Sequence, residues 1–419
     1  MPVLNVEQEE AKPSPYQCLN QVLSFPDLDQ DEWWHRTAPV LGKMMLDANY
    51  DVHRQYQYLV LFAQYVIPLL GLSPSSIGHS NRYRTFLGTF GLPMTSYAGT
   101  PDRDPFNRLG LQRLLTSLGQ SRIEMNLQLY HQLISSLTLT PTEEQRVLQQ
   151  HGSLPRLFRT QNIIGLDLTP DGNAVVKLYF RLAAKSLVSG LTTTSLTFDA
   201  IRNVDSDGRF TPAMNLIESY MHDQVKPVAM TVEGLCTTHV WISWCACDLV
   251  SPGQNRYKIY IHEFWVNLDR AADLWTLGGR IKDCPGNFQG LQILRKLWSL
   301  LAIREGSHGP LDAPSGESLI PKTGTLVFNF ELHPGDPYPQ PKVYLPLRSI
   351  IDKSVAEAVT SCFEDFGWMD HARTYTENFS SYYPSCDISQ TTELQGVLSF
   401  SYSSKNGPYV SVYYRNVGL

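Results

Sequence analysis

The feature that most constrains this chain is a Lys-hydrophobic-Tyr triplet that returns along it. The triplet stands at Lys177-Leu178-Tyr179, Lys258-Ile259-Tyr260 and Lys342-Val343-Tyr344, and Ser411-Val412-Tyr413 is a degenerate fourth copy. Each copy lies in a run rich in β-branched and aromatic residues, which is typical of a strand. Segments with helical periodicity separate the copies, which lie 81, 84 and 69 residues apart. This repetition predicts an architecture of similar helix-plus-hairpin units.

The triplet also predicts how each strand faces. Residues two apart on a strand share a face, so each copy presents a lysine and a tyrosine side by side, while its middle residue faces the helices. In an open sheet the polar face would meet water, and a single copy is typical of such a solvated surface. In a closed barrel the polar face lines the interior, and four copies, one of them extended by Arg256, converge on one chamber. The number of copies favours the barrel.

The residue types in this pattern predict the chemistry. Cations that converge in a chain of net charge -6 indicate a multiply charged anion, and a diphosphate fits. Tyrosines beside them can donate hydrogen bonds to phosphate oxygens, and their ring faces can stabilise a carbocation. Stabilising a leaving diphosphate next to an aromatic wall that shelters an allylic cation is what prenyl transfer requires.

Other classes of function lack their signatures in this sequence. The net negative charge does not indicate a nucleic acid or an anionic membrane as partner. We find no P-loop, no Gly-x-Gly-x-x-Gly and no Asp-Asp-x-x-Asp motif of the magnesium-dependent isoprenyl synthases; Asp27, Asp29 and Asp31 are expected to flank a helix start. Cys236, His239 and the nearby Cys245 and Cys247 match no common zinc spacing. We therefore expect Lys and Arg to do the work of a metal.

Composition indicates one cytosolic domain. The seven cysteines are odd in number and scattered, which suits reduced thiols and a cytoplasmic location. Residues 1–15 are polar and lack the features of a signal peptide, so we expect a flexible tail there and a single domain over residues 16–419. The most apolar run, residues 56–72, is interrupted by glutamines and a proline and is expected to be a core helix.

Five further stretches carry a resemblance to a known family. They are Trp33–Pro39, Gln55–Leu59, Asp104–Asn107, Trp275–Gly279 and Phe400–Tyr402. With the repeats, they make the chain resemble the fungal indole prenyltransferases of the dimethylallyltryptophan synthase type over nearly its whole length. The resemblance implies an α+β fold, a ten-stranded antiparallel β-barrel ringed by α-helices with the reaction inside. This is the architecture that the repeats predict.

The resemblance also implies site residues and substrates. The residues expected to contact the allylic diphosphate are Lys177, Tyr179, Arg256, Lys258, Tyr260, Tyr344, Tyr409 and Tyr413. Lys342 stands where many relatives have glutamine and would add a cation, and Phe86 and Leu87 match positions that contact the aromatic substrate. Family members need no metal for catalysis and commonly use dimethylallyl diphosphate as co-substrate. We therefore expect two small-molecule partners, a prenyl diphosphate and an aromatic acceptor, and a monomer or homodimer.

Three places bear on the acceptor. Ser243 stands where enzymes acting on free tryptophan carry an arginine, and Ile163 stands where they carry a lysine. Both differences argue against free tryptophan. Residues 49–56 resemble the group acting on tryptophan-containing cyclic dipeptides, which we expect to be the acceptors in indole alkaloid biosynthesis. Prenylation of an aromatic polyketide or another phenol is the alternative.

One segment of the family pattern is missing. Relatives follow a Gly-x-Pro-hydrophobic segment with a glutamate, the proposed base, on a first strand and a diphosphate-binding arginine on a second. Here Gly91–Met94 is followed by Thr95–Thr100 and at once by the Asp104–Asn107 motif. Thr95 falls at the glutamate position and the arginine has no counterpart. We therefore expect the first hairpin of the barrel to be lost and leave the catalytic base unassigned.

Three interpretations of this loss stay open. The first is an error in the coding sequence. The second is a real protein with impaired catalysis, which keeps the anion site as a binding protein; loss of a base lowers proton-transfer rates about a hundredfold or more. The third is an enzyme that uses another base, His262 or Glu263, of which only one can face inward because neighbouring strand residues alternate.

Overall fold

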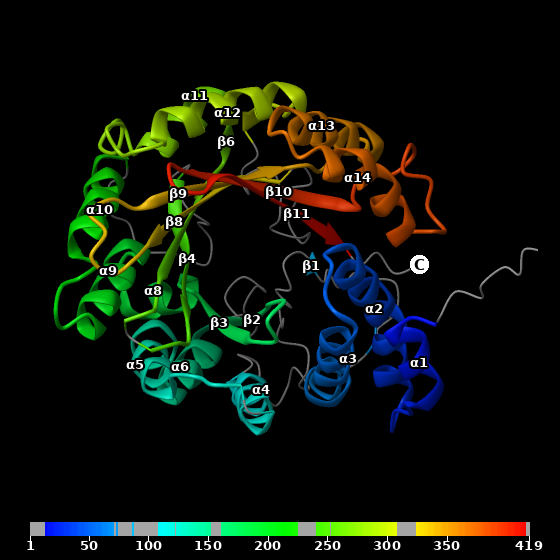
Figure 1. Ribbon diagram of the computed structural model, residues 1–419. Helices are drawn as coiled ribbons and strands as arrows, with labels where there is room; N and C mark the ends of the chain where they lie inside the picture. The colour runs from blue at the N-terminus through cyan, green and yellow to red at the C-terminus, as the bar shows by residue number, and fades with distance from the viewer. Residues whose placement is uncertain are drawn as a thin grey trace, which may run out of the picture.

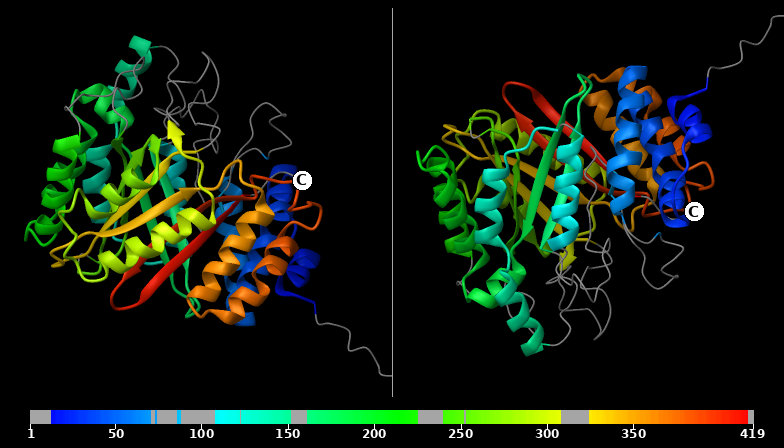
Figure 2. Two further views of the ribbon diagram at one scale, coloured as in Figure 1. Left: turned by 90° about the horizontal axis from the view of Figure 1, so that it is seen from above. Right: turned by 90° about the horizontal axis from the view of Figure 1, so that it is seen from below.

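The protein is described by a computed structural model over residues 13–70, 73, 86–87, 108–121, 123–151, 161–224, 240–251, 253–307 and 324–415. In this part of the chain the strands form a strongly curved sheet, and the helices follow one another around its outside (Figure 1). Views from above and from below show the same arrangement of helices outside strands (Figure 2). The fold of the described ranges is therefore α+β, with a large main sheet and a helical layer on its convex side.

All neighbours in the main sheet are antiparallel. The described strands run in the order β1-β11-β10-β9-β8-β5-β4-β3-β2, and β6 and β7 form a separate pair. Their bounds are β1 Phe86–Leu87, β2 Asn162–Leu168, β3 Ala174–Arg181, β4 Val240–Asp248, β5 Tyr257–Glu263, β6 Trp265–Val266, β7 Gly306–Ser307, β8 Leu326–Leu332, β9 Gln340–Pro346, β10 Gln395–Ser403 and β11 Gly407–Arg415.

Within the described ranges, helices cover the convex side of the sheet, and irregular turns continue the third of them. The bounds of the helices are α1 Pro15–Val22, α2 Leu28–Asp47, α3 Val52–Leu61, α4 Arg108–Gln120, α5 Leu127–Leu137, α6 Pro141–His151, α8 Ala183–Ser189, α9 Thr193–Val204, α10 Thr211–Gln224, α11 Leu268–Thr276, α12 Asn287–Leu300, α13 Asp352–Asp365 and α14 Met369–Tyr382. After α3 the chain continues as a π turn and a 3₁₀ turn to Leu69. None of the described helices combines the length and apolar character of a membrane span.

Local signals set several of these boundaries. Glu143 accepts a hydrogen bond from the backbone N–H of Thr140 (2.7 Å), and the Thr140 hydroxyl accepts one from the backbone N–H of Glu143 (3.2 Å), so a capping box begins α6. Asp27 caps α2 by a single bond, since its side chain accepts a hydrogen bond from the backbone N–H of Gln30. These two helix starts, expected from the sequence, are confirmed.

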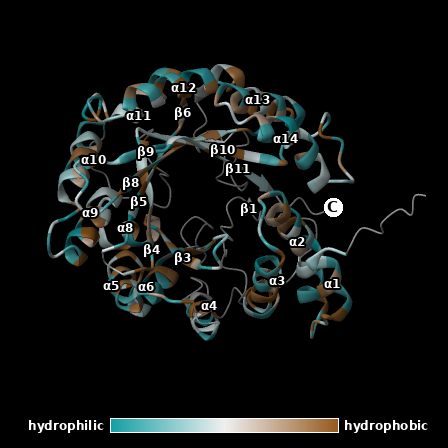
Figure 3. Ribbon diagram, in the orientation of Figure 1, coloured by the Kyte–Doolittle hydropathy of each residue, from teal (hydrophilic) through white to brown (hydrophobic). Residues whose placement is uncertain are grey.

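The helix-facing side of the sheet forms the core. Its fully buried side chains are large and apolar, and Figure 3 shows hydrophobic stretches on the strands and on the helices around them. They include Leu178, Phe180, Ile259, Ile261, Phe328, Phe330, Val343, Leu345, Leu398 and Phe400. Burying each contributes about 1.5–3 kcal/mol relative to exposure. Because these apolar side chains face the helices, the alternate residues of each strand face the concave side of the sheet.

The β2–β3 hairpin is anchored from the helical layer. The Tyr58 hydroxyl on α3 lies 2.6 Å from the carbonyl oxygen of Thr169 and 2.9 Å from that of Asn173. Gly172 turns the chain between the two strands with φ of 93°, in the left-handed region that favours glycine. The anchor holds β2 and β3 against the helices.

The sheet is curled, and the described part of it has two edges. One edge is β2 and the other is the two-residue strand β1, which pairs with β11. These edges are not paired with each other within the described ranges, so the described strands form a curled open sheet. The prediction that a hairpin is lost after Gly91 concerns a segment, Thr95 included, that lies outside the described residues.

Candidate active site

Four tyrosines form a continuous row on the concave face of the sheet. Tyr179, Tyr260, Tyr344 and Tyr413 come from β3, β5, β9 and β11. Their ring centroids are 5.9, 6.0 and 5.8 Å apart in that order. We call these four residues the tyrosine belt. Burial raises the pKa of every one of the four hydroxyls, which therefore stay neutral hydrogen-bond donors.

Strand direction sorts the residues on either side of the belt. Strands β3, β5, β9 and β11 alternate with antiparallel partners, so all four run the same way. Residues two before each belt tyrosine therefore lie toward one end of the concave face, and residues two after it lie toward the other. The first group includes Lys177, Lys258 and Lys342, and the second includes Arg181 and His262.

At the first end, two cations share one carboxylate. Glu331 of β8 accepts a hydrogen bond from Lys342 Nζ (3.1 Å) and one from Arg256 Nη1 (3.1 Å). Arg256 also donates through Nε to Asp248 of β4 at 2.6 Å. Burial alone would raise the pKa of Glu331, but Lys342, Lys258 and Arg256 outweigh it and hold that pKa well below its ordinary value. Glu331 is therefore a carboxylate at working pH.

The other two cations complete the group. Lys177 forms an ion pair with Asp167 of β2, and Lys258 Nζ lies 3.8 Å from Asp248 Oδ1. Lys258 is only 5% exposed. Burial, followed by the charge of Lys177, lowers the pKa of Lys258 to about 7. We call Lys177, Arg256, Lys258 and Lys342 the cation cluster.

Three carboxylates in this cluster were missed by sequence reasoning. Asp167, Asp248 and Glu331 lie on strands that carry no Lys-x-Tyr triplet, and they meet the cations only through strand register. Asp248 pairs directly with Lys177, and Glu331 pairs directly with Lys258. Four cations and three carboxylates leave a net formal charge of +1, so the cluster is less positive than the sequence predicted. No short sequence motif predicts which residues of two separate strands are paired.

Tyr409 lies at the rim of the cation cluster. Lys342 Nζ is 4.8 Å from the centroid of the Tyr409 ring, within the range of a cation–π contact. Tyr409 is 47% exposed, whereas Lys342 is largely buried. The structure thus brings together all nine residues expected from the sequence to surround a diphosphate.

The opposite side of the belt, which we call the far end, is aromatic. It consists of Arg181, Trp241, Trp244 and His262. The Arg181 guanidinium carbon lies 4.2 Å from the centroid of the Trp244 ring, and the two residues are directly paired across β3 and β4. The rings of Trp241 and His262 are 6.1 Å apart. Burial and then the charge of Arg181 lower the pKa of His262 to about 4, so its ring is neutral at neutral pH.

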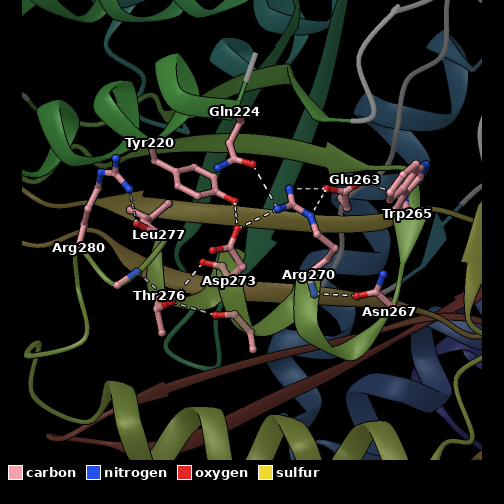
Figure 4. A network of polar contacts seen from close by, with 12 residues as sticks. Tyr220, Gln224, Glu263, Trp265, Asn267, Arg270, Asp273, Thr276, Leu277 and Arg280 are labelled. Carbon is pink, nitrogen blue, oxygen red and sulfur yellow. Dashed lines mark hydrogen bonds and ion pairs between the residues drawn. The ribbon is translucent and has the colours of Figure 1, made fainter.

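Glu263, the neighbour of His262, faces the helices. Its side chain is fully buried and accepts hydrogen bonds from Arg270 Nη2 (2.8 Å) and Nε (3.0 Å). Arg270 also reaches Asp273 at 2.9 Å, and the Tyr220 hydroxyl donates to Asp273 at 2.7 Å, as Figure 4 shows. Of the two alternative bases, only His262 faces the concave side.

The positions expected to bear on the acceptor are only partly described. Phe86 and Leu87 form β1, paired with Arg415 and Tyr414 of β11, and their side chains lie outside the described residues. Ile163 lies directly opposite Tyr179 across β2 and β3. The Ser243 hydroxyl donates to the carbonyl oxygen of Tyr260 at 3.3 Å.

The chain is similar to known prenyltransferases in both sequence and structure. The family model described as tryptophan dimethylallyltransferase matches residues 29–96 and 93–378. The prenyltransferase ucdE of Aspergillus ustus is 41% identical over 97% of each chain, and the verruculogen prenyltransferase of Neosartorya fischeri is 38% identical over 97% of this chain and 96% of its own. The crystal structure of NotF in complex with brevianamide F and DMSPP has a TM-score of 0.80 and 30% identity, covering 97% of this chain and all of that one.

Proposed function

The chain belongs to the tryptophan dimethylallyltransferase family, and from that premise we propose that it transfers a dimethylallyl group from dimethylallyl diphosphate to an indole acceptor. The acceptor we propose is a tryptophan-containing cyclic dipeptide, in indole alkaloid biosynthesis in the cytosol. The single observation that carries the proposal is the cation cluster beside the tyrosine belt. A diphosphate needs the first, and an allylic cation needs the second.

The donor binds with its diphosphate at the cation cluster. Lys177, Arg256, Lys258 and Lys342 neutralise the charge that develops as the carbon–oxygen bond breaks. Because these side chains supply that charge, the proposed reaction needs no metal. The belt hydroxyls and Tyr409 donate further hydrogen bonds to the phosphate oxygens.

The allylic carbons lie along the belt. Ring faces stabilise the cation electrostatically, and a wall of four neighbouring rings keeps water from it. The acceptor ring must then attack from the side away from the diphosphate, which is the far end. There the ring of an indole could stack against Trp244 or Trp241, and this supports an aromatic acceptor.

The proposed class of acceptor rests on two kinds of support. Ile163 and Ser243 offer no cation for the carboxylate of a free amino acid, which favours a cyclic dipeptide. Relatives named as a roquefortine prenyltransferase and a deoxybrevianamide E synthase align over 97% of the chain, at 34% and 31% identity. An aromatic polyketide or another phenol remains the alternative acceptor.

We further propose that the complete family barrel has ten strands and that this chain lacks the first hairpin. The match to the family model is divided into two segments that overlap at residues 93–96, so it is interrupted where the hairpin is expected to be missing. The alignment to ucdE spans 449 positions, whereas 97% of 419 residues is about 406, so about 43 positions of the alignment hold no residue of this chain. Sequencing the transcript across the codons for Pro93 to Asp104 tests this directly: extra codons encoding a glutamate and an arginine would identify a coding-sequence error.

The proposed activity is tested by incubating the chain with dimethylallyl diphosphate and a panel of tryptophan-containing cyclic dipeptides. We expect a product that is heavier by one dimethylallyl group and forms equally well with a chelator present. Donor binding without product would favour the binding-protein alternative. Loss of product with chelator would indicate a metal-dependent prenyl transfer and contradict the proposal.

A further inference from the structure

The proposed reaction leaves a proton that some group must accept. When the acceptor ring attacks, the carbon that forms the new bond still carries its hydrogen, and the ring regains aromaticity only when that proton leaves. The accepting group must face the concave side beyond the tyrosine belt. The resemblance to relatives places a glutamate for this role where the chain has Thr95.

The concave face of the described strands offers few proton acceptors. Three carboxylates, Asp167, Asp248 and Glu331, all lie at the cation cluster and are ion-paired with its members. At the far end Arg181 stays protonated, because a guanidinium does not release its proton in proteins. Among the concave-face residues of the described strands, this leaves His262 as the far-end side chain with a basic lone pair.

His262 is held in a defined orientation. Its Nδ1 lies 3.3 Å from the Thr325 hydroxyl, and its ring lies 6.1 Å from that of Trp241 on the neighbouring strand. With the Nδ1 proton donated to Thr325, Nε2 carries the lone pair. On β5 it follows Tyr260 by two residues, so it lies next to the belt on the side away from Lys258.

We propose that His262 Nε2 is the catalytic base that removes this proton, an assignment that rests on the proposed function. The carbon–oxygen bond of the donor breaks, and its electron pair leaves with the diphosphate. A π electron pair of the acceptor ring forms the new carbon–carbon bond to the allylic cation. The carbon–hydrogen bond then breaks, its electron pair returns to the ring, and the proton passes to Nε2.

The protonation state of His262 suits this step. A pKa lowered to about 4 leaves the ring neutral at neutral pH and gives it a basicity close to that of an ordinary glutamate, about 4.3. An arenium ion is a strong acid, so a weak base suffices. The groups facing His262 are Arg181 on β3, Trp241 on β4, Tyr260 on its own strand, Val327 on β8 and Thr325. Of these, only Arg181 carries a charge, and it favours release of the proton after the step.

The test uses the full chain with His262→Gln and, as a matched control, His371→Gln on the exposed face of α14. We measure turnover of a cyclic dipeptide deuterated on its indole carbons, and binding of dimethylallyl thiolodiphosphate by calorimetry. We expect His262→Gln to lose about a hundredfold or more in turnover. It should also show a deuterium isotope effect that the wild type lacks, with donor-analogue affinity within about twofold. The isotope effect identifies proton transfer, which a merely structural residue would not change.

Each other outcome overturns the assignment in a distinct way. Wild-type turnover by His262→Gln overturns the base and leaves the proposed function standing. Loss of donor-analogue binding together with turnover indicates a structural role for the histidine. A wild-type chain that binds the donor analogue but yields no product contradicts the proposed function itself, and the base with it.

Discussion

The cation cluster and the far end share strands β3 and β5 but differ in their contacts, which are ion pairs at the cluster and aromatic rings at the far end. The cluster holds four cations and three carboxylates in direct ion pairs. The far end holds one permanent charge, Arg181, stacked on Trp244, with a neutral His262 beside Trp241. Lys177, Lys258 and Lys342 lie two residues before a belt tyrosine, whereas Arg181 and His262 lie two residues after one. The direction of a strand therefore decides whether a side chain meets a diphosphate or an aromatic ring.

The two ends are therefore preorganised for different substrates. The cations are held in place by carboxylates before any ligand binds, so little reorganisation remains for the diphosphate. The aromatic end offers surface and stacking instead of charge, which suits a neutral acceptor. Substitutions at one end should therefore leave binding at the other end unchanged.

The largest expected effect is at the centre of the cation cluster. Lys258→Ala removes a buried cation and leaves Asp248 and Glu331 with less compensation. We expect donor-analogue affinity to fall about a hundredfold, about 2.7 kcal/mol, and acceptor binding to stay unchanged. Calorimetric titration checks both. Lys353→Ala, on the exposed side of α13, is the control and should bind like the wild type; equal losses in both variants would refute the prediction.

The next largest effect is a pH dependence of donor affinity, which acceptor affinity should not share. Because the pKa of Lys258 is lowered to about 7, its side chain is mostly neutral above pH 7 in the free protein. A bound diphosphate favours the charged form, so binding takes up a proton, and affinity falls as the pH rises, by at most about tenfold per unit. Titrations between pH 7.5 and 9 in buffers of different ionisation enthalpy measure this uptake. Lys258→Ala should abolish the uptake, and an affinity independent of pH in the wild type would contradict the prediction.

A smaller effect, on acceptor binding, is expected at the far end. Arg181→Gln removes the cation stacked on Trp244, and we expect the KM for a cyclic dipeptide to rise about fivefold to tenfold, as for a lost cation–π or charged hydrogen bond. Donor-analogue affinity should remain within about twofold. If donor binding falls as far as acceptor binding, the two ends are not independent.

The smallest effect tests the carboxylates. Glu331→Gln removes one negative charge from the cluster, and we expect donor-analogue affinity to rise about threefold. The folded-state pKa of Glu331 is depressed, so its charge stabilises the fold above the ordinary glutamate pKa, and this contribution disappears as the pH falls below it. Thermal unfolding should therefore show a lower Tm for the variant at neutral pH and a smaller difference in acid. Weaker donor binding would mean that Glu331 positions the cations more than it competes for them.

Much of the donor side could be predicted from the sequence, because side chains alternate between the two faces of a strand and this alternation involves only neighbouring residues. The Lys-x-Tyr triplets fixed which side chains share a face, and the four strands bring their lysines and tyrosines together. The capping box at Thr140 was equally readable, since its partners are three residues apart. Local patterns sufficed where the interacting residues are near in sequence or repeat.

The far end and the carboxylates could not be predicted because both depend on register. A register shift between Ile242 and Trp244 changes which residues of β4 face inward, so Trp244 and Asp248 lie on the concave face while Cys245 and Cys247 are buried on the other. No local sequence pattern predicts that register shift. The pairing of Glu331 with Lys258 likewise joins residues 73 positions apart.

The most direct test of the division into two ends is a crystal structure of the chain with dimethylallyl thiolodiphosphate bound. We predict that the diphosphate contacts Lys258 and Lys342, and that the allylic carbons lie along the tyrosine belt and point toward His262. A diphosphate bound beside Arg181, or allylic carbons directed toward Tyr409, would contradict the account.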